Sequence, residues 1–540
     1  MKFRYLVLLV FFLKDYILCQ NFNYTNDDWY ILPNLSSINA ISEDNLNIYF
    51  ATDIGVIKYE KIMEDFQFDY GLFINANFKN IRHMIYDDFR DYFWIVHSDG
   101  ISYKSSISSI WRELSLSTTR IFNIYEIDDL GYSSEYVWIR SMDDLYPFDP
   151  FTARLAKWED AKNEIDFINW GHSKFGISGK NIDMSSFLIE GDWLVGINRI
   201  HSIQDGKELH PSLFMEDQER NLWFGTEEGF ILKGWRHSNR LDLIKIGIPF
   251  NNVTTSYFDD EGVWWFADSQ FKRTGKHLMG NNKSFLVSWK ESENSWTYYD
   301  LNELISKQNL DVNSIKRIGS IMYFGTMSGL LYLDLYDLEW NMLNVSNGLY
   351  DSAIWDIVEY DNSIYLATSN GVNEVSIINH SIIPDRDKKF EFLSHVSIYD
   401  LLSDSNTFYL ATNIGLFKID WDIWNPQLIT KKIFKKIKIQ DQKIFGLNEN
   451  LWLIDVGENE ELQILTNIHD FDVCYSHVWA SKKNKAKVLN LITNVDFEYD
   501  QSDGIPGNKI FSIECDEKWV WFSTNGGVAF YKWGDYHEEN

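Results

Sequence analysis

The chain has 540 residues and a formal net charge of -30, from 49 basic and 79 acidic side chains. This charge argues against nucleic-acid binding and against docking on anionic lipid, because both need a cationic face. Apolar residues make up 45% of the chain and charged residues 24%, which is typical of folded domains, and the length suggests two to four of them. The aromatic content of 16% favours β structure.

The N-terminus resembles a leader. Lys2 and Arg4 precede an apolar run over 5–13 that is too short to span a bilayer. This pattern predicts a secretory signal peptide over residues 1–20 and a mature protein that is secreted, periplasmic or on the outer surface of a bacterium. Cys19 is a candidate for lipidation, which the bulky Leu18 before it disfavours. No later stretch is apolar enough to cross a membrane, so we expect the mature chain not to span one.

A repeat runs through the rest of the chain. Each clear copy has an aromatic residue, then a small residue and Thr, and ends in Gly. The clear copies cover 49–55, 223–229, 323–329, 365–371, 409–415 and 521–527. Weaker copies begin at Trp94, Trp138 and Trp265, and faint ones at Trp193, Trp452 and Trp479. The copies mostly lie 42 to 45 residues apart, which is the length of a four-stranded propeller blade.

The pattern within one copy predicts strands. Short alternating apolar runs cover 37–42, 48–52 and 56–59, with turn residues between them. A segment containing Trp, such as 29–32, would supply the fourth strand of a blade. Gly55 and its equivalents suit a tight turn, which needs a positive φ.

The segment 504–531 resembles the two-component-regulator propeller repeat, and 216–226 is a second similar copy. The resemblance covers most of 30–535. It implies a sensor-type propeller module of the kind found outside the cytoplasm in bacterial signalling proteins. In that family the propellers precede a membrane helix, an immunoglobulin-like domain and a histidine kinase. This chain departs from the arrangement, because no such pattern follows its last copy.

We therefore expect an all-β fold of tandem β-propellers with four-stranded antiparallel blades, about 12 in total. The longest gap between copies places the boundary near residue 300. That division gives an N-terminal propeller over 21–300 and a C-terminal propeller over 301–540, with six blades each. Two seven-bladed rings with degenerate blades are the alternative.

The loops between the second and third strands of the blades carry the candidate site. In a propeller these loops line one face around the channel mouth. In the N-terminal half they are acidic, whereas the C-terminal half holds Ser328, Asn370, Asn413 and Asn525. The acidic residues are Asp53, Asp99, Asp143, Glu227, Glu228 and Asp268.

If these carboxylates converge, they would attract a hard cation such as Ca²⁺ or a cationic ligand. On that reading the candidate metal ligands are Asp53, Asp99, Asp143, Glu227 and Asp268. The alternative is a solvated acidic face in which Asp serves as a turn residue. Aspartates also recur in the first turn of several copies, at Asp44, Asp217, Asp259 and Asp516, where capping of the turn explains them.

Two cysteines remain after the leader. Cys474 and Cys515 precede Trp479 and Trp521 by similar intervals, so they occupy similar places on the inner strands of consecutive blades. A disulfide between them would join the closing blades. The alternative is that the two strands lie farther apart than the Cα spacing of about 5.5 Å that a bridge needs.

Sequence signatures of catalysis and phosphate binding are absent, and the 12 histidines are scattered. We expect an extracytoplasmic module that binds a ligand or protein and is not an enzyme. Its partner would be an extracellular ligand or an envelope protein, in surface sensing, glycan capture or envelope assembly. Two alternatives stand beside this one. A carbohydrate-active lyase or hydrolase could use the acidic loops as acid and base, or the chain could be a structural spacer.

Overall fold

The computed structural model describes most of the chain. The described residues are 28–34, 37–53, 55–67, 80–108, 110–142, 144–176, 182–190, 193–203, 208–250, 252–268, 285–293, 295–301, 310–386, 388–404, 406–457 and 460–537. Within them the strands form twelve sheets, nearly all with antiparallel neighbours. The predicted fold class, tandem β-propellers of four-stranded blades, is confirmed. The predicted leader and Cys19 lie outside the described residues.

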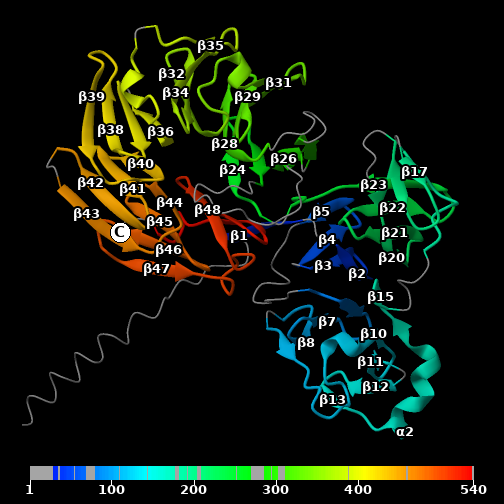
Figure 1. Cartoon of the computed structure of the whole chain (residues 1–540). Coiled ribbons are helices and arrows are strands. Elements are labelled where there is room, and N and C mark those ends of the chain that lie inside the picture. The colour runs from blue at the N-terminus through cyan, green and yellow to red at the C-terminus, as the bar shows by residue number, and fades with distance from the viewer. Residues whose placement is uncertain are drawn as a thin grey trace, which may run out of the picture.

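The first set of sheets spans β2 to β23 and is coloured blue to green in Figure 1. Its four main sheets are β2 (Ile38–Glu43), β3 (Asn47–Thr52), β4 (Val56–Glu60) and β5 (Asp65–Gln67); β6 (His83–Asp87), β7 (Tyr92–His97), β8 (Gly100–Ser105) and β9 (Arg112–Glu113); β10 (Ile127–Tyr132), β11 (Val137–Ser141), β12 (Asp144–Asp149) and β13 (Arg154–Leu155); and β20 (Pro211–Glu216), β21 (Asn221–Thr226), β22 (Ile231–Trp235) and β23 (Arg240–Ile244). A fifth, small sheet contains β17 (Trp193–Val195), β18 (Ile200–Ser202) and β19 (Glu208–Leu209).

The first strands of the four main sheets lie side by side. β20 contacts β2, β2 contacts β6 and β6 contacts β10. After the third of these sheets the chain forms the short helix α2 (Trp158–Ala161) and the 3-10 helix η4 (Lys162–Phe167), and Figure 1 shows α2 at the far end of the set. β16 (Leu188–Ile189) pairs in parallel with β23 at the other end.

The chain itself lines the inner edge of this first set. β14 (Asn169–Trp170) pairs with β10, and β15 (His172–Ser173) pairs with β2. Gly171 joins the two short strands, and a Cβ atom there would lie 2.6 Å from the side chain of Ile85 on β6. Only glycine allows so close an approach. The segment therefore runs across the first strands of three sheets, where a propeller has its channel.

The second set contains seven sheets. They are β24 (Thr255–Phe258), β25 (Val263–Ala267), β26 (Phe285–Lys290) and β27 (Ser295–Asp300); β28 (Val312–Ile318), β29 (Ile321–Thr326), β30 (Gly329–Asp334) and β31 (Trp340–Leu343); β32 (Ile354–Tyr360), β33 (Ser363–Thr368), β34 (Gly371–Ser376) and β35 (Ile382–Ile383); β36 (Ile398–Asp404), β37 (Thr407–Thr412), β38 (Gly415–Asp420) and β39 (Asn425–Thr430); β40 (Lys436–Gln440), β41 (Lys443–Leu447), β42 (Asn450–Asp455) and β43 (Glu460–Thr466); β44 (Asp470–Cys474), β45 (His477–Lys482), β46 (Lys485–Asn490) and β47 (Asp496–Tyr499); and β48 (Ile510–Cys515), β49 (Val520–Thr524), β50 (Gly527–Tyr531) and β1 (Trp29–Pro33).

These seven sheets form a ring. The first strand of each sheet contacts the first strand of the next, from β24 through to β48, and β48 contacts β24. The last sheet has three strands from the C-terminus and takes its fourth, β1, from the N-terminus. Trp29 of β1 lies opposite Tyr531 and stacks on its ring, with 4.6 Å between centroids. Apart from short 3-10 turns such as η7 (Val345–Asn347) and η8 (Glu391–Leu393), the described part of the ring is built of strands.

The strand contacts divide the molecule between β23 and β24. The spacing of the repeat copies predicted a division near residue 300, which groups β24 to β27 with the N-terminal half. The two sets share one buried cluster, which includes Phe50 and Trp223 of the first set and Trp264, Trp289 and Trp521 of the second. The segment between β23 and β24 contributes Ile246 and Ile248 to the same cluster. The two sets of sheets therefore pack against each other.

The repeated Thr and Gly build the turn between the second and third strands. In four sheets of the ring the Thr hydroxyl donates to the carbonyl oxygen of the Gly three residues later, at distances of 2.7–2.8 Å. The pairs are Thr326 with Gly329, Thr368 with Gly371, Thr412 with Gly415, and Thr524 with Gly527. All four glycines have φ between 100° and 137°, a region that other residues rarely adopt. The predicted role of the glycine is confirmed at these turns.

Candidate functional site

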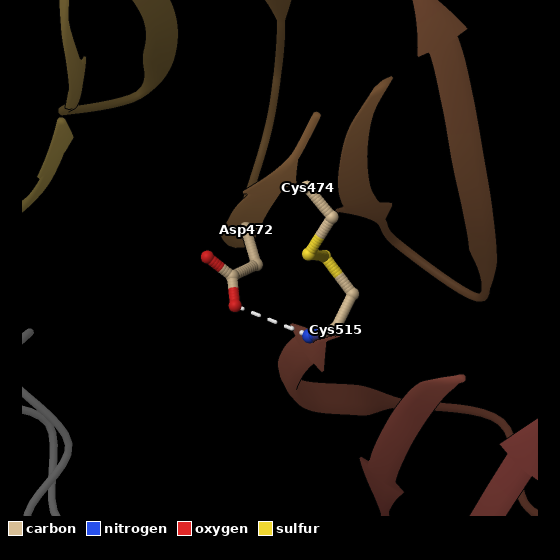
Figure 2. A group of neighbouring side chains, drawn as sticks. All are labelled: Asp472, Cys474 and Cys515. Carbon is tan, nitrogen blue, oxygen red and sulfur yellow. Dashed lines mark hydrogen bonds between the residues drawn. A yellow bond between two sulfur atoms is a disulfide. The ribbon is translucent and has the colours of Figure 1, made fainter. Parts of the chain in front are cut away.

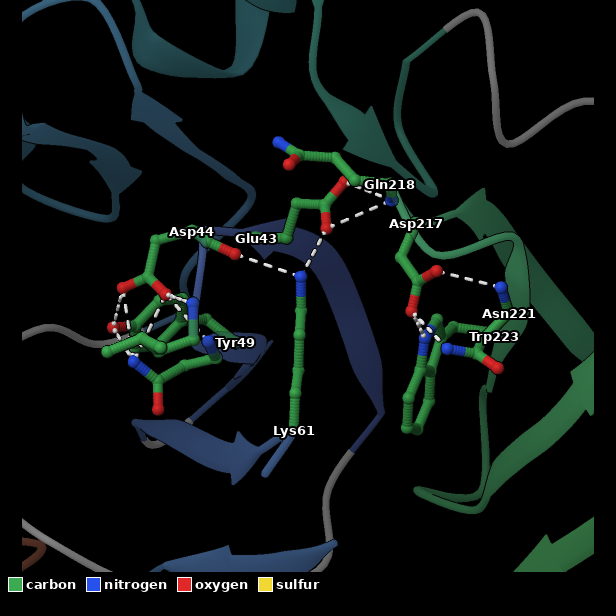
Figure 3. Close-up of polar contacts among 10 residues, drawn as sticks. Glu43, Asp44, Tyr49, Lys61, Asp217, Gln218, Asn221 and Trp223 are labelled. Atoms are coloured by element: carbon green, nitrogen blue, oxygen red, sulfur yellow. Dashed lines mark hydrogen bonds and ion pairs between the residues drawn. The ribbon is translucent and has the colours of Figure 1, made fainter. Parts of the chain in front are cut away.

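Aspartates in the first turns of the sheets bond to their own turn and to the repeat aromatic. Oδ1 of Asp217 accepts from the Asn221 backbone (2.7 Å), and its Oδ2 accepts from Nε1 of Trp223 (2.9 Å). In the first sheet, Asp44 accepts from the backbone of Asn47 (2.6 Å) and from the Tyr49 hydroxyl (2.7 Å). Figure 3 shows both groups. These carboxylates therefore have the capping role that their recurrence predicted.

An ion pair within the first sheet lies at the junction with the fourth sheet of the first set (Figure 3). Nζ of Lys61 lies 2.7 Å from the Glu43 carboxylate and donates to the Asp44 carbonyl oxygen (2.9 Å). The same carboxylate accepts from the backbone N–H of Gln218, which follows β20 (3.2 Å). Glu43 is thus satisfied by contacts that hold neighbouring sheets together, and we assign it a structural role.

The predicted acidic loop residues of the first set have neighbours of their own. Nδ2 of Asn39 donates to the Asp53 carboxylate at 2.6 Å. Burial lowers the pKa of Lys174, and the charges of Asp53 and Glu227 oppose that shift. Glu228 lies 2.7 Å from Nδ1 of His210. Its hydrogen bond to that imidazole raises the pKa of His210.

The remaining candidates lie elsewhere. Asp99 follows His97, and its backbone N–H approaches Nδ1 of that histidine at 3.4 Å. Asp143 lies outside the described residues. Asp268 belongs to the ring, after β25, where burial and the charge of Asp311 raise its pKa to about 7.

Within the described ranges, no three of the predicted carboxylates place their oxygens within 4.8 Å of one another. Calcium binding and a solvated acidic face both stay open as interpretations of these loops. A titration of the wild-type chain, with D53N/D99N beside it, would decide between them.

Charged side chains on the first strands of the ring form a group that the sequence analysis missed. Lys436 and Lys438 of β40 face Asp470 and Asp472 of β44. The Nζ–Oδ1 distances are 2.9 Å for Lys436 with Asp470 and 3.2 Å for Lys438 with Asp472. Glu514 of β48 belongs to the same group. The available signal was charge at alternate positions of a predicted strand, which places both residues on one face.

Aspartates of the ring also bond across to the next sheet. Oδ2 of Asp400 on β36 accepts from the backbone N–H of Ile437 on β40 (2.6 Å). Oδ2 of Asp470 on β44 accepts in the same way from Ile513 on β48 (3.0 Å). Each first strand is the inner edge of its sheet and has unpaired backbone groups on that side. The aspartates satisfy some of these groups and tie adjacent sheets together.

The charges in this group shift the pKa values of Glu514 and Lys438. Burial raises the pKa of Glu514 to about 7, with Lys436 and Lys438 opposing the shift and Asp472 and Asp470 adding to it. The charge of Asp472 is the largest cause that raises the pKa of Lys438. The two lysines therefore only partly offset the effect of burial on the Glu514 carboxylate.

The two cysteines are joined in a disulfide on the same strands. Cys474 ends β44 and Cys515 ends β48, with 6.1 Å between their Cα atoms. The first strands of neighbouring sheets thus approach closely enough for a bridge. Figure 2 shows Asp472 beside it, with Oδ2 accepting from the Cys515 backbone N–H (3.1 Å). Because both sulfurs are engaged in the disulfide, this trio offers no thiolate to a metal.

No family model and no curated protein sequence match the chain. Among solved structures it is similar to PorZ of Porphyromonas gingivalis, described as an essential bacterial surface component of the type-IX secretion system. The identity is 11% over 94% of this chain and 87% of that one, with a TM-score of 0.57. It is also similar to the extracellular domain of BT4673 from B. thetaiotaomicron, described as a one-component system. There the identity is 12% over 92% of this chain and 70% of that one, with a TM-score of 0.42.

The likeness to PorZ shows the fold. In the part of the chain that the structure describes, no helix is both long and apolar enough to cross a membrane.

Proposed function

We propose that this chain is an extracytoplasmic binding module that recognises a protein or ligand at the bacterial surface and carries out no catalysis. The observation that carries the proposal is the likeness of fold to PorZ, a bacterial surface component, along 94% of this chain. Surface sensing, glycan capture and envelope assembly are the roles that fit such a module.

The disulfide supports the compartment. Cys474 and Cys515 form a bridge in the ring wall, and such bridges form and persist in oxidising compartments outside the cytoplasm. The basic and apolar pattern over 1–13 supports export as well.

The polar groups of the ring wall support binding over catalysis. Asp400 and Asp470 bond to backbone of the next sheet, and Lys436 and Lys438 pair with carboxylates of β44. A hydrolase or lyase needs an acid and a base free to reach a substrate. The aspartates of this group are engaged in holding the ring together.

The test is retention of partners on the immobilised mature chain, residues 21–540. Envelope and cytosolic fractions of the source cells are passed over it separately, and retained proteins and glycans are identified by mass spectrometry. We expect retention from the envelope fraction that survives physiological salt. Equal retention from both fractions, or turnover of an envelope glycan by the chain, would overturn the proposal.

A further inference from the structure

The ring has two distinct ends. Lys436 and Asp470 are the first residues of β40 and β44, and Lys438 and Asp472 are the third; both pairs are in contact. The two first strands therefore run parallel and in step. Connections into the first strands, and those between second and third strands, lie at the end where the first strands begin. We call this the leading end of the ring.

Exposed lysines gather at the leading end of the last three sheets. Lys431 lies between β39 and β40, Lys482 and Lys483 lie where β45 turns into β46, and Lys509 precedes β48. All four side chains are exposed. Within the described residues none of the four forms an ion pair. They contrast with Lys436 at the same end, whose charge is matched by Asp470.

The opposite end of the same sheets is acidic. Asp441 lies in the turn between β40 and β41, Glu460 begins β43, and Asp516 and Glu517 lie between β48 and β49; all four are exposed. Lys443 and Lys518 are exposed at that end too, so its exposed charge is acidic only on balance, whereas the exposed charge at the leading end is basic on balance. In a chain with a net charge of -30, exposed basic residues at one end are a local reversal of sign.

Acidic residues at the leading end are few and partly engaged. Glu449, between β41 and β42, is exposed. Asp500 and Asp503 are half-buried: Oδ2 of Asp503 accepts from the Asp500 backbone N–H (2.7 Å), and the Asp500 carboxylate lies 3.6 Å from Nζ of Lys485. Glu498, near the end of β47, is exposed and lies 3.4 Å from Nζ of Lys485. Among the described residues, the four lysines outnumber the exposed carboxylates at this end.

Apolar side chains accompany the lysines. Ile414, between β37 and β38, is 49% exposed, and Ile433, between β39 and β40, is 46% exposed. Both lie at the leading end. Protein interfaces combine an apolar centre with a polar rim, whereas an anionic polymer is held mainly by charge and needs no isoleucine.

We propose that this lysine surface, made of Lys431, Lys482, Lys483 and Lys509 with Ile414 and Ile433, docks an acidic patch on a partner protein. The inference rests on the proposed function and names the chemistry of its partner. Opposite charge would speed the encounter with the acidic surface. Contact with the isoleucines would then bury apolar area.

The direct test uses a fluorescein-labelled peptide rich in Glu with interspersed Leu. Its anisotropy is followed with the wild-type chain, with K431E/K482E, and with K443E/K518E. The control pair reverses two exposed lysines at the opposite end. We expect K431E/K482E to weaken binding about tenfold or more at low salt and the control to change it less than about twofold. Thermal melting checks that all three proteins fold alike.

Three results would overturn the inference. They are absence of peptide binding to the wild-type chain, equal loss in the control, and preference for a sulfated polysaccharide that K431E/K482E abolishes. The retention experiment separates this inference from the proposed function. If K431E/K482E still retains the envelope partner, the binding module stands and the lysine surface is wrong. If the wild-type chain retains nothing, the proposed function fails whatever the peptide does.

Discussion

The two sets of sheets differ in how their outermost sheets are held in place. In the ring, the last sheet is completed by β1 and tied to its neighbour by the Cys474–Cys515 disulfide. In the first set, the third sheet is followed by α2 and η4, whose Glu164 accepts from the Ser134 hydroxyl (2.8 Å) and the Glu135 backbone (3.1 Å). In the first set, a short segment thus bonds back to the turn between β10 and β11, whereas the ring closes by contact between its first and last sheets.

This difference predicts how far the loss of one contact between sheets destabilises the rest of the molecule. Each ring sheet has a neighbour on both sides, so loss of one junction exposes two apolar faces. The end of the first set is secured by local contacts, and its loss should stay local. The predictions below run from the largest expected effect to the smallest.

Removal of the Trp29 side chain should weaken the ring most. It is 3% exposed and packs on Tyr531 and Phe522. Trp29→Ala should lower the free energy of unfolding by about 4 kcal/mol, the usual loss for a buried Trp. Urea denaturation followed by Trp fluorescence measures this. Trp235→Ala, which removes an exposed Trp of the first set, is the matched control, and an equal loss there would contradict ring closure by β1.

Loss of the disulfide should come next. The two cysteines are separated by 41 residues, and removal of a bridge across such a loop costs about 3 kcal/mol. The double variant C474A/C515A should melt at a lower temperature than the wild type, and dithiothreitol should bring the wild type to the same value. A melting temperature unchanged in both experiments would show that the bridge contributes nothing.

His537 should make the C-terminal sheet sensitive to acid. It is 7% exposed, and its Nε2 lies 2.8 Å from the Tyr499 hydroxyl, with the His477 ring 5.8 Å away. Burial, with a smaller contribution from His477, lowers its pKa from 6.5 to about 4. A released tail would bind a proton near pH 6.5 and the folded one only near pH 4. Stability is therefore complete above pH 6.5 and falls as the pH drops toward 4, by about 3 kcal/mol.

His537→Phe is the variant that tests this. Unfolding free energies at pH 7.5 and pH 4.5 should differ less in the variant than in the wild type. His201→Phe, which changes a histidine of the first set that is partly exposed, should leave the difference as it is. If His537→Phe keeps the full pH dependence, another group is responsible.

Loss of the contacts that Glu164 of η4 makes with the third sheet of the first set should destabilise the protein less. Glu164→Ala removes acceptors for Ser133, Ser134 and the Glu135 backbone, which should cost about 1–2 kcal/mol. Hydrogen exchange should rise in β10 to β13 and stay unchanged in the ring. Faster exchange throughout the chain would show that the two sets unfold together.

The smallest effect should come from calcium. Asp53 accepts a hydrogen bond from Asn39, and Glu228 lies against His210. Both carboxylates therefore have protein partners in the absence of a cation. We expect millimolar calcium to leave the melting temperature nearly unchanged. A clear rise that D53N/D99N abolishes would instead establish the metal site predicted from the sequence.

The sequence predicted the blades because their features are local. The aromatic, the Thr and the Gly of each copy lie within one hairpin, and Gly329 shows the expected positive φ. The first-turn aspartates were predictable for the same reason. Grouping of the sheets was harder, since a gap in spacing cannot tell which first strands touch. Trp265 belongs to the ring only because β24 contacts β28 and β48.

The candidate site was harder still. Asp53 and Asp99 follow equivalent strands, but convergence depends on how the sheets pack, and the segment across 169–173 takes up the inner edge. The charged group on β40 and β44 needed two strands to be aligned across a sheet boundary. The sequence of each strand, taken alone, does not show how β40 and β44 align.

The position of β1 has a consequence for the order of events in the cell. Asp28, just before it, accepts a hydrogen bond from Tyr536, 508 residues away in the chain. The ring cannot close until Tyr536 has left the ribosome and can meet Asp28. Contacts between such distant residues form slowly, so the unfinished last sheet would present an open edge in the meantime. The last sheet therefore stays open long enough for the chain to be threaded through a membrane channel, which is compatible with the export that we propose.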